Sequence, residues 1–245
     1  MVHSNLSAKD RLIFALDVSS AVEAVKWVRT LETLVGCFKI GLELFIKEGP
    51  AAIRAVQENS SACIFLDLKL HDIPATLSGA LRSASHFGIR YITAHCEPGF
   101  SPIISQLQPL PSDLKVLGIT VLTSLGEKQL PAMGIRDCMT LQELTLNRTD
   151  MAREMGCAGV VCSGQEATAI RNYCGNDFLI ITPGIRPEWS ETVGDDQTRV
   201  TTPRTAIASG ADLIVVGRPI RMASDPRSAA IKTAEEINQG MEDRK

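Results

Sequence analysis

The segment FLDLKLHDIP, residues 65–74, places three charged side chains within six positions at the end of an apolar run. Asp67 and Asp72 supply carboxylates, and Lys69 between them supplies an ammonium. Because charged groups are costly to desolvate, a protein core normally excludes such a cluster. Alternating acids and bases neutralise one another and fix each head group, which creates a preorganised field containing a proton donor. These residues are therefore candidate catalytic groups, with a structural ion-pair network as the alternative.

Two further charged residues stand at or near the ends of apolar runs elsewhere in the chain. Asp17 ends RLIFALD, and Lys39 lies near the end of GCFKI. Each has a simpler interpretation, because an Asp at a strand end commonly caps the next helix and a lone Lys can extend its ammonium to solvent. Together with the first cluster, they give four or five ionisable groups that one fold could bring to one place.

Eight short apolar runs predict strands buried on both faces, because they lack the polar–apolar alternation of a half-exposed sheet. Amphipathic segments lie between several of them, and Ser19-Ser20 are possible caps for the first. This alternation over 245 residues predicts an α/β protein, a single (β/α)8 TIM barrel spanning residues 1–245. The predicted strands are 11–17, 36–40, 62–67, 90–94, 115–121, 157–162, 178–182 and 212–216, and the helical segments are 19–34, 73–87, 140–155, 164–173 and 203–209.

A doubly wound open sheet is the alternative fold, but the chain contains neither GxGxxG nor GxxxxGKS/T, so its common nucleotide-binding forms are unsupported. The net charge of −3 without a basic block argues against nucleic-acid binding. Seven cysteines without a CxxC pair indicate free thiols in a reducing cytoplasm rather than a disulfide framework or a structural zinc site. The N-terminus MVHSNLSAKD lacks an apolar signal core and no apolar run approaches membrane-spanning length, so a cytoplasmic protein is expected.

In a (β/α)8 barrel the active site is built at the carboxyl ends of the strands. That rule brings Asp17, Lys39, Asp67 and Lys69 to one mouth of the predicted barrel. If the extended conformation continues through Lys69, this side chain and Asp67 point to the same side of the strand.

The end of the eighth predicted strand carries Gly217 and Arg218, where the backbone can approach an anion and a guanidinium can hold it bidentately. The long polar segment 183–202 follows the seventh strand and contains Arg186 and Gln197. Because barrels often bind phosphate with the loops after strands seven and eight, a phosphate site is predicted here. A surface ion pair of Arg218 is the alternative.

Other polar residues near the predicted mouth are less specific. Thr123 and Ser124 follow the fifth strand and could bind a ligand or cap the next helix. His95 could face the mouth, but with Glu97 it makes too small a set to indicate a metal site. Cys96 has no evident base partner and is expected to pack.

These motifs occur in the order of a known family between residues 14 and 220. The chain resembles the orotidine 5′-phosphate decarboxylases, which convert orotidine 5′-phosphate (OMP, orotidylate) to UMP in pyrimidine biosynthesis without a metal or an organic cofactor. The DxKxxD element and the final GR are shared with a wider group of decarboxylases and aldolases, whereas FKIG and the Arg/Gln loop are more selective. The matching motifs are FALDV, FKIG, FLDLKLHDIPAT, VLTS, TPGIRP, DDQTR and VVGRPI.

The resemblance implies a role for each charged residue. Lys69 is expected to donate a proton to C6 of the pyrimidine, and Asp67 to lie beside the departing carboxylate. Lys39 and Asp72 are expected to complete the charged array, and Asp17 to contact the ribose.

The resemblance also implies a homodimer, because the family's equivalents of Asp72 and Thr76 reach the active site of the partner subunit. Thr123 is expected to contact the base. The phosphate contacts implied are Arg186 and Gln197 from the closing loop, with Gly217 and Arg218 at the end of the eighth strand. The HCEPG segment, residues 95–99, departs from many relatives, which have smaller residues there, so the role of its histidine stays open.

Two other functions fit parts of the pattern. The first is a magnesium-dependent sugar-phosphate decarboxylase or aldolase of the same barrel group, whose members carry an acidic metal ligand at the end of the second strand. Lys39 stands at that position here, and its charge would repel the ion. The second is a catalytically silent phosphate-ligand sensor, which would be recognised by missing catalytic residues; none of the expected ones is missing.

Overall fold

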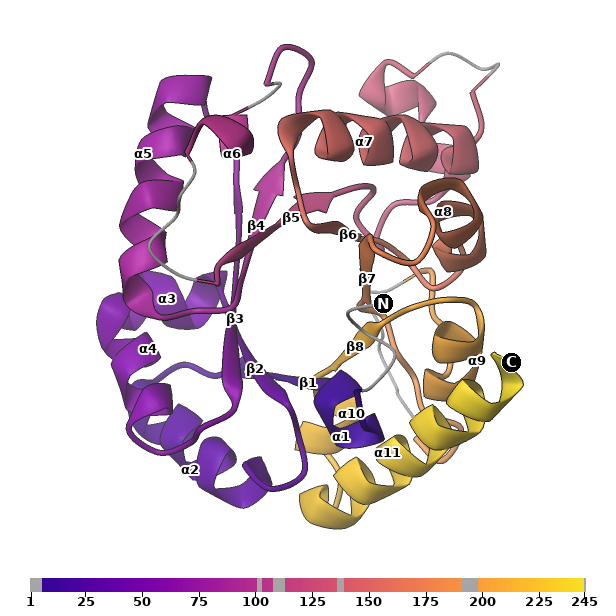
Figure 1. Cartoon of the computed structure of the whole chain (residues 1–245). Coiled ribbons are helices and arrows are strands. Elements are labelled where there is room, and N and C mark those ends of the chain that lie inside the picture. Colours follow the sequence, from indigo (N-terminus) through magenta and orange to yellow (C-terminus); the bar gives the residue numbers. More distant parts are fainter. Residues whose placement is uncertain (1–5, 101–102, 108–112, 136–138, 191–197, 245) are drawn as a thin grey trace.

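In the computed structural model, eight parallel strands close into a barrel in chain order, with β1 paired to both β2 and β8. The structure describes residues 6–100, 103–107, 113–135, 139–190 and 198–244. Figure 1 looks along the barrel, with the helices outside the ring of strands. The strands are β1 (Leu12–Ala15), β2 (Cys37–Gly41), β3 (Cys63–Leu70), β4 (Tyr91–His95), β5 (Lys115–Ile119), β6 (Gly159–Val161), β7 (Leu179–Thr182) and β8 (Leu213–Val216). The predicted (β/α)8 barrel is confirmed.

Side-chain caps mark the starts of some of the helices. Ser20 caps α2 by accepting a hydrogen bond from the Glu23 amide, and Thr140 with Glu143 forms a capping box at the start of α7. The α-helices are α1 (Ala8–Arg11), α2 (Ala21–Leu31), α3 (Leu42–Glu48), α4 (Pro50–Gln57), α5 (Pro74–Ala84), α6 (Ile103–Gln106), α7 (Leu141–Met155), α8 (Ala167–Cys174), α9 (Pro203–Ala208), α10 (Arg218–Arg221) and α11 (Pro226–Asp243). Short 3-10 turns lie at Ser85–Phe87, Glu127–Gln129 and Pro131–Met133.

The strands are apolar throughout because the core lies on both of their faces. One cluster fills the barrel interior and includes Ile13, Phe65 and Leu179, while a larger one lies between strands and helices and includes Phe14 and Phe38. Neighbouring residues of a strand alternate between the two clusters, so no position of β1, β7 or β8 faces water.

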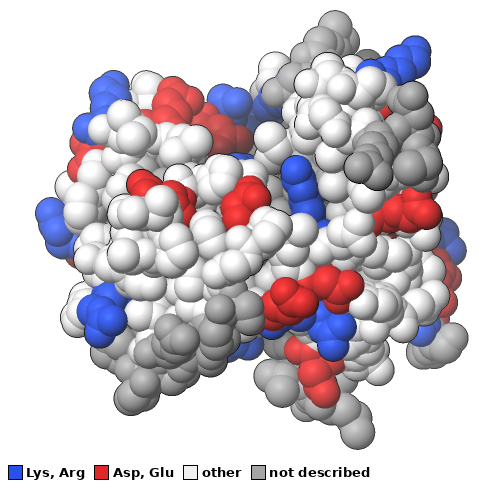
Figure 2. All heavy atoms as spheres, turned by 90° about the horizontal axis from the view of Figure 1, so that it is seen from above, with Lys and Arg blue, Asp and Glu red and all other residues white. Residues whose placement is uncertain are grey.

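The surface carries charges of both signs. In the side view of Figure 2, acidic and basic side chains are interspersed among uncharged residues. No helix in the described ranges has both the length and the apolar composition that a membrane span requires.

Candidate active site

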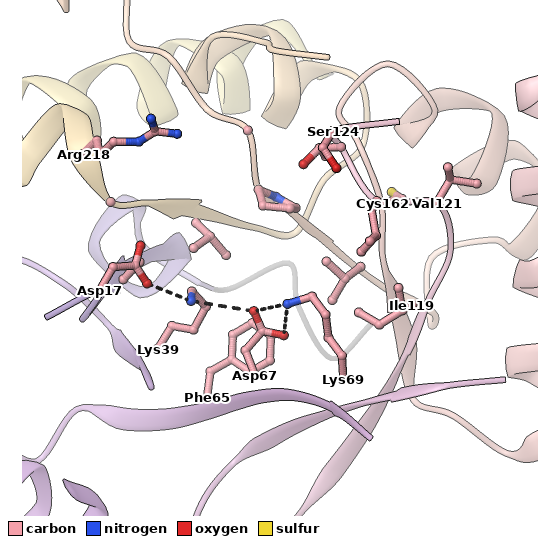
Figure 3. A pocket seen from close by; sticks show the side chains of 18 of the residues that line it. Asp17, Lys39, Phe65, Asp67, Lys69, Ile119, Val121, Ser124, Cys162 and Arg218 are labelled. Carbon is pink, nitrogen blue, oxygen red and sulfur yellow. Dashed lines mark hydrogen bonds and ion pairs between the residues drawn. The ribbon is translucent and has the colours of Figure 1, made fainter. Parts of the chain in front are cut away.

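A cavity of about 320 Å³ opens at the carboxyl ends of the strands, within the size range of small-molecule sites. Its walls come from β1, β2, β3, β5, β6 and β8 and from the segment that follows β7 (Figure 3). The predicted residues that line it are Asp17, Lys39, Asp67, Lys69, Thr123, Arg186, Gly217 and Arg218.

Four of these side chains form a row of alternating charge along one wall of the cavity (Figure 3). The Lys39 Nζ atom lies 3.3 Å from Asp17 Oδ1 and 3.7 Å from Asp67 Oδ2. The Lys69 Nζ atom donates to both carboxylate oxygens of Asp67, at 2.9 Å each. This row of Asp17, Lys39, Asp67 and Lys69 is called the charged row below.

The backbone of β3 departs from regular strand geometry where it presents Lys69. The pairing of β3 with β4 shifts register between Leu66 and Leu70, and Lys69 has φ of 51°, the one positive value among the described non-glycine residues. A side chain in this left-handed conformation costs energy and persists where surrounding contacts impose it. Lys69 and Asp67 do meet, as predicted, but through this irregularity rather than through simple strand alternation.

Thr93 holds this irregular segment in place. Its hydroxyl accepts a hydrogen bond from the Lys69 amide at 2.9 Å and donates one to Asp67 Oδ1 at 2.9 Å. Thr93 was not predicted from the sequence. The available signal was a threonine at the centre of β4 (YITAH), where a fully buried hydroxyl needs a hydrogen-bond partner.

Two glycines make room for the charged groups. A Cβ atom at Gly41 would lie 3.2 Å from Lys39 Nζ, and one at Gly217 would lie 3.2 Å from Asp17 Oδ2. Both contacts are tighter than side-chain carbons normally make, so the glycines of FKIG and VVGRPI permit the row to assemble.

Asp67 and Lys39, in the middle of the charged row, are kept ionised by their neighbours. Burial alone would raise the pKa of Asp67, but the ammonium groups of Lys39 and Lys69 and the hydrogen bonds from Lys69 and Thr93 outweigh burial, so the pKa is lowered. Burial likewise acts to lower the pKa of Lys39, and the carboxylates of Asp67 and Asp17 reverse this and raise it. The row is therefore a fixed ionic array that faces a ligand-sized cavity.

The cavity has different surroundings along its length. Arg218 projects above the Asp17 end of the row, whereas Ile119, Val121 and Cys162 lie beyond Lys69 (Figure 3). A ligand that fits this sequence of groups has an anionic end, a polar middle and a less polar end.

Two predicted residues do not reach this cavity. Asp72 and Thr76 are exposed and are not among its lining residues, and Asp72 Oδ1 accepts a hydrogen bond from the Ile73 amide at 2.7 Å. Of the four or five ionisable groups expected at the mouth, the four of the charged row meet within one chain, and Asp72 does not join them. Gln197 lies outside the described residues.

His71 and His95 lie outside the wall of the cavity. His95 is not a lining residue; its ring stacks with that of His71 at 4.8 Å between centroids, and His71 Nε2 lies 3.1 Å from Glu97 Oε1. Cys96 is buried with its Sγ 3.9 Å from that of Cys157, which confirms a packing role.

Comparison with known proteins agrees with this geometry. The profile of the Orotidine 5'-phosphate decarboxylase / HUMPS family matches residues 10–233. The chain is 42% identical to the orotidine 5'-phosphate decarboxylase of Syntrophus aciditrophicus, and the match covers 97% of each protein. It is 41% identical to the orotidine 5'-phosphate decarboxylase of Gloeothece citriformis, and this match covers 93% of this chain and 97% of the other. The crystal structure of the enzyme from Lactobacillus acidophilus superposes with a TM-score of 0.77 at 32% identity, covering 93% of this chain and 98% of the other. The chain therefore belongs to the orotidine 5′-phosphate decarboxylase / HUMPS family.

Proposed function

We propose that this protein decarboxylates orotidine 5′-phosphate to UMP, using the charged row and neither a metal nor an organic cofactor. The observation that carries the proposal is the position of Lys69, whose ammonium is held against both oxygens of Asp67 at the wall of a ligand-sized cavity. The relatives named above are orotidine 5′-phosphate decarboxylases, which supports the same substrate here.

In the proposed reaction, the bond between C6 and the carboxylate breaks, CO₂ leaves, and the electron pair stays on C6. Such a carbanion has no electron sink, so a fixed positive charge must meet it as it develops. Lys69 supplies that charge, and its proton passes to C6; the neutral amine then regains a proton from water. Asp67 orients Lys69 and repels the substrate carboxylate, while Lys39 keeps Asp67 ionised.

The order of groups along the cavity matches the parts of the nucleotide. Arg218 and Gly217, with Arg186 and Gln197, bind the phosphate in this proposal, and Asp17 contacts the ribose. Thr123 contacts the base, which lies against Ile119, Val121 and Cys162, the less polar end of the cavity. The phosphate is remote from C6, so its binding energy serves to close the site and place the ring rather than to activate the bond.

The magnesium-dependent sugar-phosphate decarboxylase or aldolase considered in the sequence analysis is the second candidate. The donor set does not favour it, because the ammonium of Lys39, in the middle of β2, lies 3.7 Å from the Asp67 carboxylate that a cation would need. A silent phosphate sensor is the third candidate, and the complete charged row argues against it.

Release of CO₂ from orotidylate in the presence of EDTA separates the three candidates. Full activity in the chelator supports the proposal. Activity on a sugar phosphate that returns only with added Mg²⁺ would support the second candidate, and binding of nucleotide without any turnover would support the sensor.

We also propose a homodimer in which Asp72 and Thr76 complete the partner subunit's site. Residues 71–76 are all exposed, and exposed apolar side chains occur nearby on α3 and before α5: Leu42, Ile46 and Ile73, at 51%, 79% and 65% exposure. A contiguous exposed apolar patch is typical of an interface, and we propose that these side chains form one. A two-fold axis through this surface would give each site one Asp72 from the opposite chain. We further propose a cytoplasmic location, which suits the free thiols of the described cysteines.

Subunit exchange tests the shared site. Inactive Lys69→Ala and Asp72→Ala chains, once mixed, should form heterodimers with one site intact and one lacking both groups. Activity should return, up to about one working site per heterodimer. If verified exchange restores nothing, Asp72 serves its own barrel.

A further inference from the structure

The segment that follows the undescribed residues 191–197 returns to the barrel mouth at Thr198. The amide and the hydroxyl of Thr198 both donate to the carbonyl of Thr123, at 3.3 and 3.1 Å. We call Thr198–Thr201 the return segment. Its first residue is thus fixed to the loop after β5, which forms the less polar end of the cavity.

Arg199 carries this attachment into the protein interior. Its NH2 group donates to the carbonyls of Val121 at 2.9 Å and Leu122 at 3.1 Å, and its NH1 group donates to Glu166 in the loop between β6 and α8. The side chains of Arg199 and Glu166 are only 5% and 6% exposed. A buried ion pair contributes little net stability, because desolvation of the charges offsets their attraction. The pair of Arg199 and Glu166 is better explained by the loops that it holds in place.

Thr201, at the other end of the return segment, is hydrogen-bonded to the backbone of Arg186, which is a predicted phosphate contact. The Arg186 amide donates to the Thr201 carbonyl at 2.8 Å, and the Thr201 amide donates to the Gly184 carbonyl at 3.2 Å. A Cβ atom at Gly164 would lie 2.4 Å from Thr201 Oγ1, so the loop after β6 packs tightly against the same residue. The return segment therefore joins the loops after β5, β6 and β7.

We propose that Arg199, oriented by Glu166, is a positioning residue that couples phosphate binding to the placement of Val121–Thr123 against the pyrimidine. This inference rests on the proposed function. A phosphate held by Arg186 fixes Thr201 through the hydrogen bond from the Arg186 amide, and Arg199 passes this constraint to the backbone of Val121 and Leu122, two residues that line the cavity. A side chain that merely stabilises the fold would not distinguish ligands with and without a phosphate.

The test compares ligands that differ only in the phosphate. For wild type and variants, the measurements are affinities for UMP and uridine by calorimetry, and kcat/KM for orotidylate and orotidine. In Arg199→Met, the preference for the phosphorylated ligand should fall by up to about 100-fold, because a small misplacement of the ring costs that much. Arg199→Lys should recover part of it, because Lys can pair with Glu166 but has no planar fork for the two carbonyls as well.

Arg171→Met is the matched control, because Arg171 also forms a buried ion pair, with Asp212, but at the opposite end of the barrel. It should lower the melting temperature and leave the phosphate preference within about 3-fold of wild type, since the pair lies far from the cavity. An unchanged preference in folded Arg199→Met, or an equal loss in Arg171→Met, would overturn the inference.

Glu166→Gln provides a second variant if Arg199→Met does not fold. Burial raises the pKa of Glu166, although Arg199 opposes this, so a neutral amide is tolerable there. This variant keeps an acceptor for Arg199 while weakening its hold, and the phosphate preference should fall by about 10-fold. If the phosphate preference does not fall in Glu166→Gln, the inference is wrong. Absence of orotidylate turnover in wild type would instead overturn the proposed function itself.

Discussion

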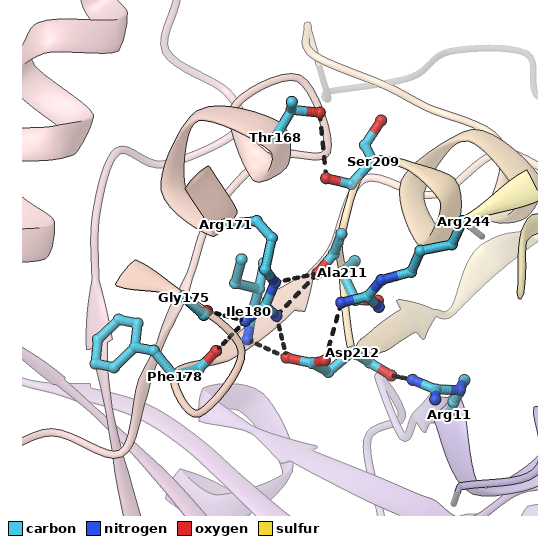
Figure 4. A network of polar contacts seen from close by, with 11 residues as sticks. Arg11, Thr168, Arg171, Gly175, Phe178, Ile180, Ser209, Ala211, Asp212 and Arg244 are labelled. Atoms are coloured by element: carbon cyan, nitrogen blue, oxygen red, sulfur yellow. Dashed lines mark hydrogen bonds and ion pairs between the residues drawn. The ribbon is translucent and has the colours of Figure 1, made fainter. Parts of the chain in front are cut away.

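The two ends of the barrel each carry a buried cluster of charges, and the clusters differ in where their hydrogen bonds go. At the carboxyl end, the charged row lies along a cavity, with the Lys69 side chain 31% exposed (Figure 3). At the amino end, Asp212 joins Arg171, Arg244 and Arg11 at the starts of β1, β7 and β8 (Figure 4). Its side chain is only 4% exposed.

In the amino-end cluster, the guanidinium groups donate hydrogen bonds to backbone carbonyls. Arg171 donates to the carbonyls of Gly175, Phe178 and Gly210, as well as to Asp212 at 2.6 Å. The carboxylate of Asp212 also accepts from the Ile180 amide at 2.9 Å, and its carbonyl accepts from Arg11 at 2.9 Å. This cluster is closed on itself and joins the chain ends to the barrel.

If the proposed function is correct, the same residue types serve stability at one end and chemistry at the other, according to what their remaining hydrogen-bonding capacity faces. In barrels the amino end commonly serves stability and the carboxyl end catalysis. Here the amino-end groups are directed at backbone, whereas the charged row is directed at a space that a ligand can fill. The following variants separate the two functions.

The largest effect is expected for Lys69→Ala. Decarboxylation of orotidylate should fall by at least about 100-fold, while UMP binding persists, because the ammonium matters most in the transition state. The measurements are kcat and the UMP dissociation constant. A variant that keeps more than a few per cent of wild-type turnover would remove Lys69 from the role of proton donor.

Arg218→Ala should have the next largest effect. Loss of the phosphate contact should lower kcat/KM for orotidylate by about 10- to 100-fold and barely alter that for orotidine, since only the nucleotide carries the phosphate. Steady-state kinetics on both substrates check this. An equal loss on both would show that Arg218 acts on something other than the phosphate.

Asp212→Ala addresses the amino end and should change stability instead of turnover. Removing this carboxylate leaves the buried Arg171 without its ionic partner, which costs about 3–5 kcal/mol in the free energy of unfolding. The melting temperature should fall by roughly 6–20 °C, with kcat unchanged below the transition. A large loss of kcat in the folded variant would erase the distinction between the two ends.

The smallest effect is expected from pH. The pKa of Asp67 lies below its ordinary 3.8, so the stability from its ionised form is present above that value and is lost only as pH falls through the lower folded pKa. The pKa of Lys39 lies above 10.5, so its contribution is lost only as pH rises through the higher folded pKa. Between about pH 5 and pH 9, neither group should change kcat by more than about 2-fold. The measurement is kcat as a function of pH for wild type and Lys39→Arg. A change of kcat between about pH 5 and pH 9 whose midpoint shifts in the variant would contradict the expectation for Lys39.

Local patterns in the sequence determined the barrel and most of the residues at its mouth. Apolar runs without alternation specify strands buried on both faces, and the polar residues that end those runs must then meet at one end. Asp17, Lys39, Asp67 and Arg218 could be placed in this way from their positions alone. The roles assigned to them, and the sharing of Asp72 between subunits, stay predictions.

Only the tertiary structure decided how those side chains are held. The left-handed backbone at Lys69 and the bridging hydroxyl of Thr93 depend on the register shift between β3 and β4. The buried pair of Arg199 and Glu166 joins residues 33 positions apart. Asp72 stands near Lys69 in sequence, yet its side chain lies outside its own cavity because the strand has already ended at Leu70. Local propensity encodes the elements, but register and loop contacts are fixed only when the closed barrel brings distant segments together.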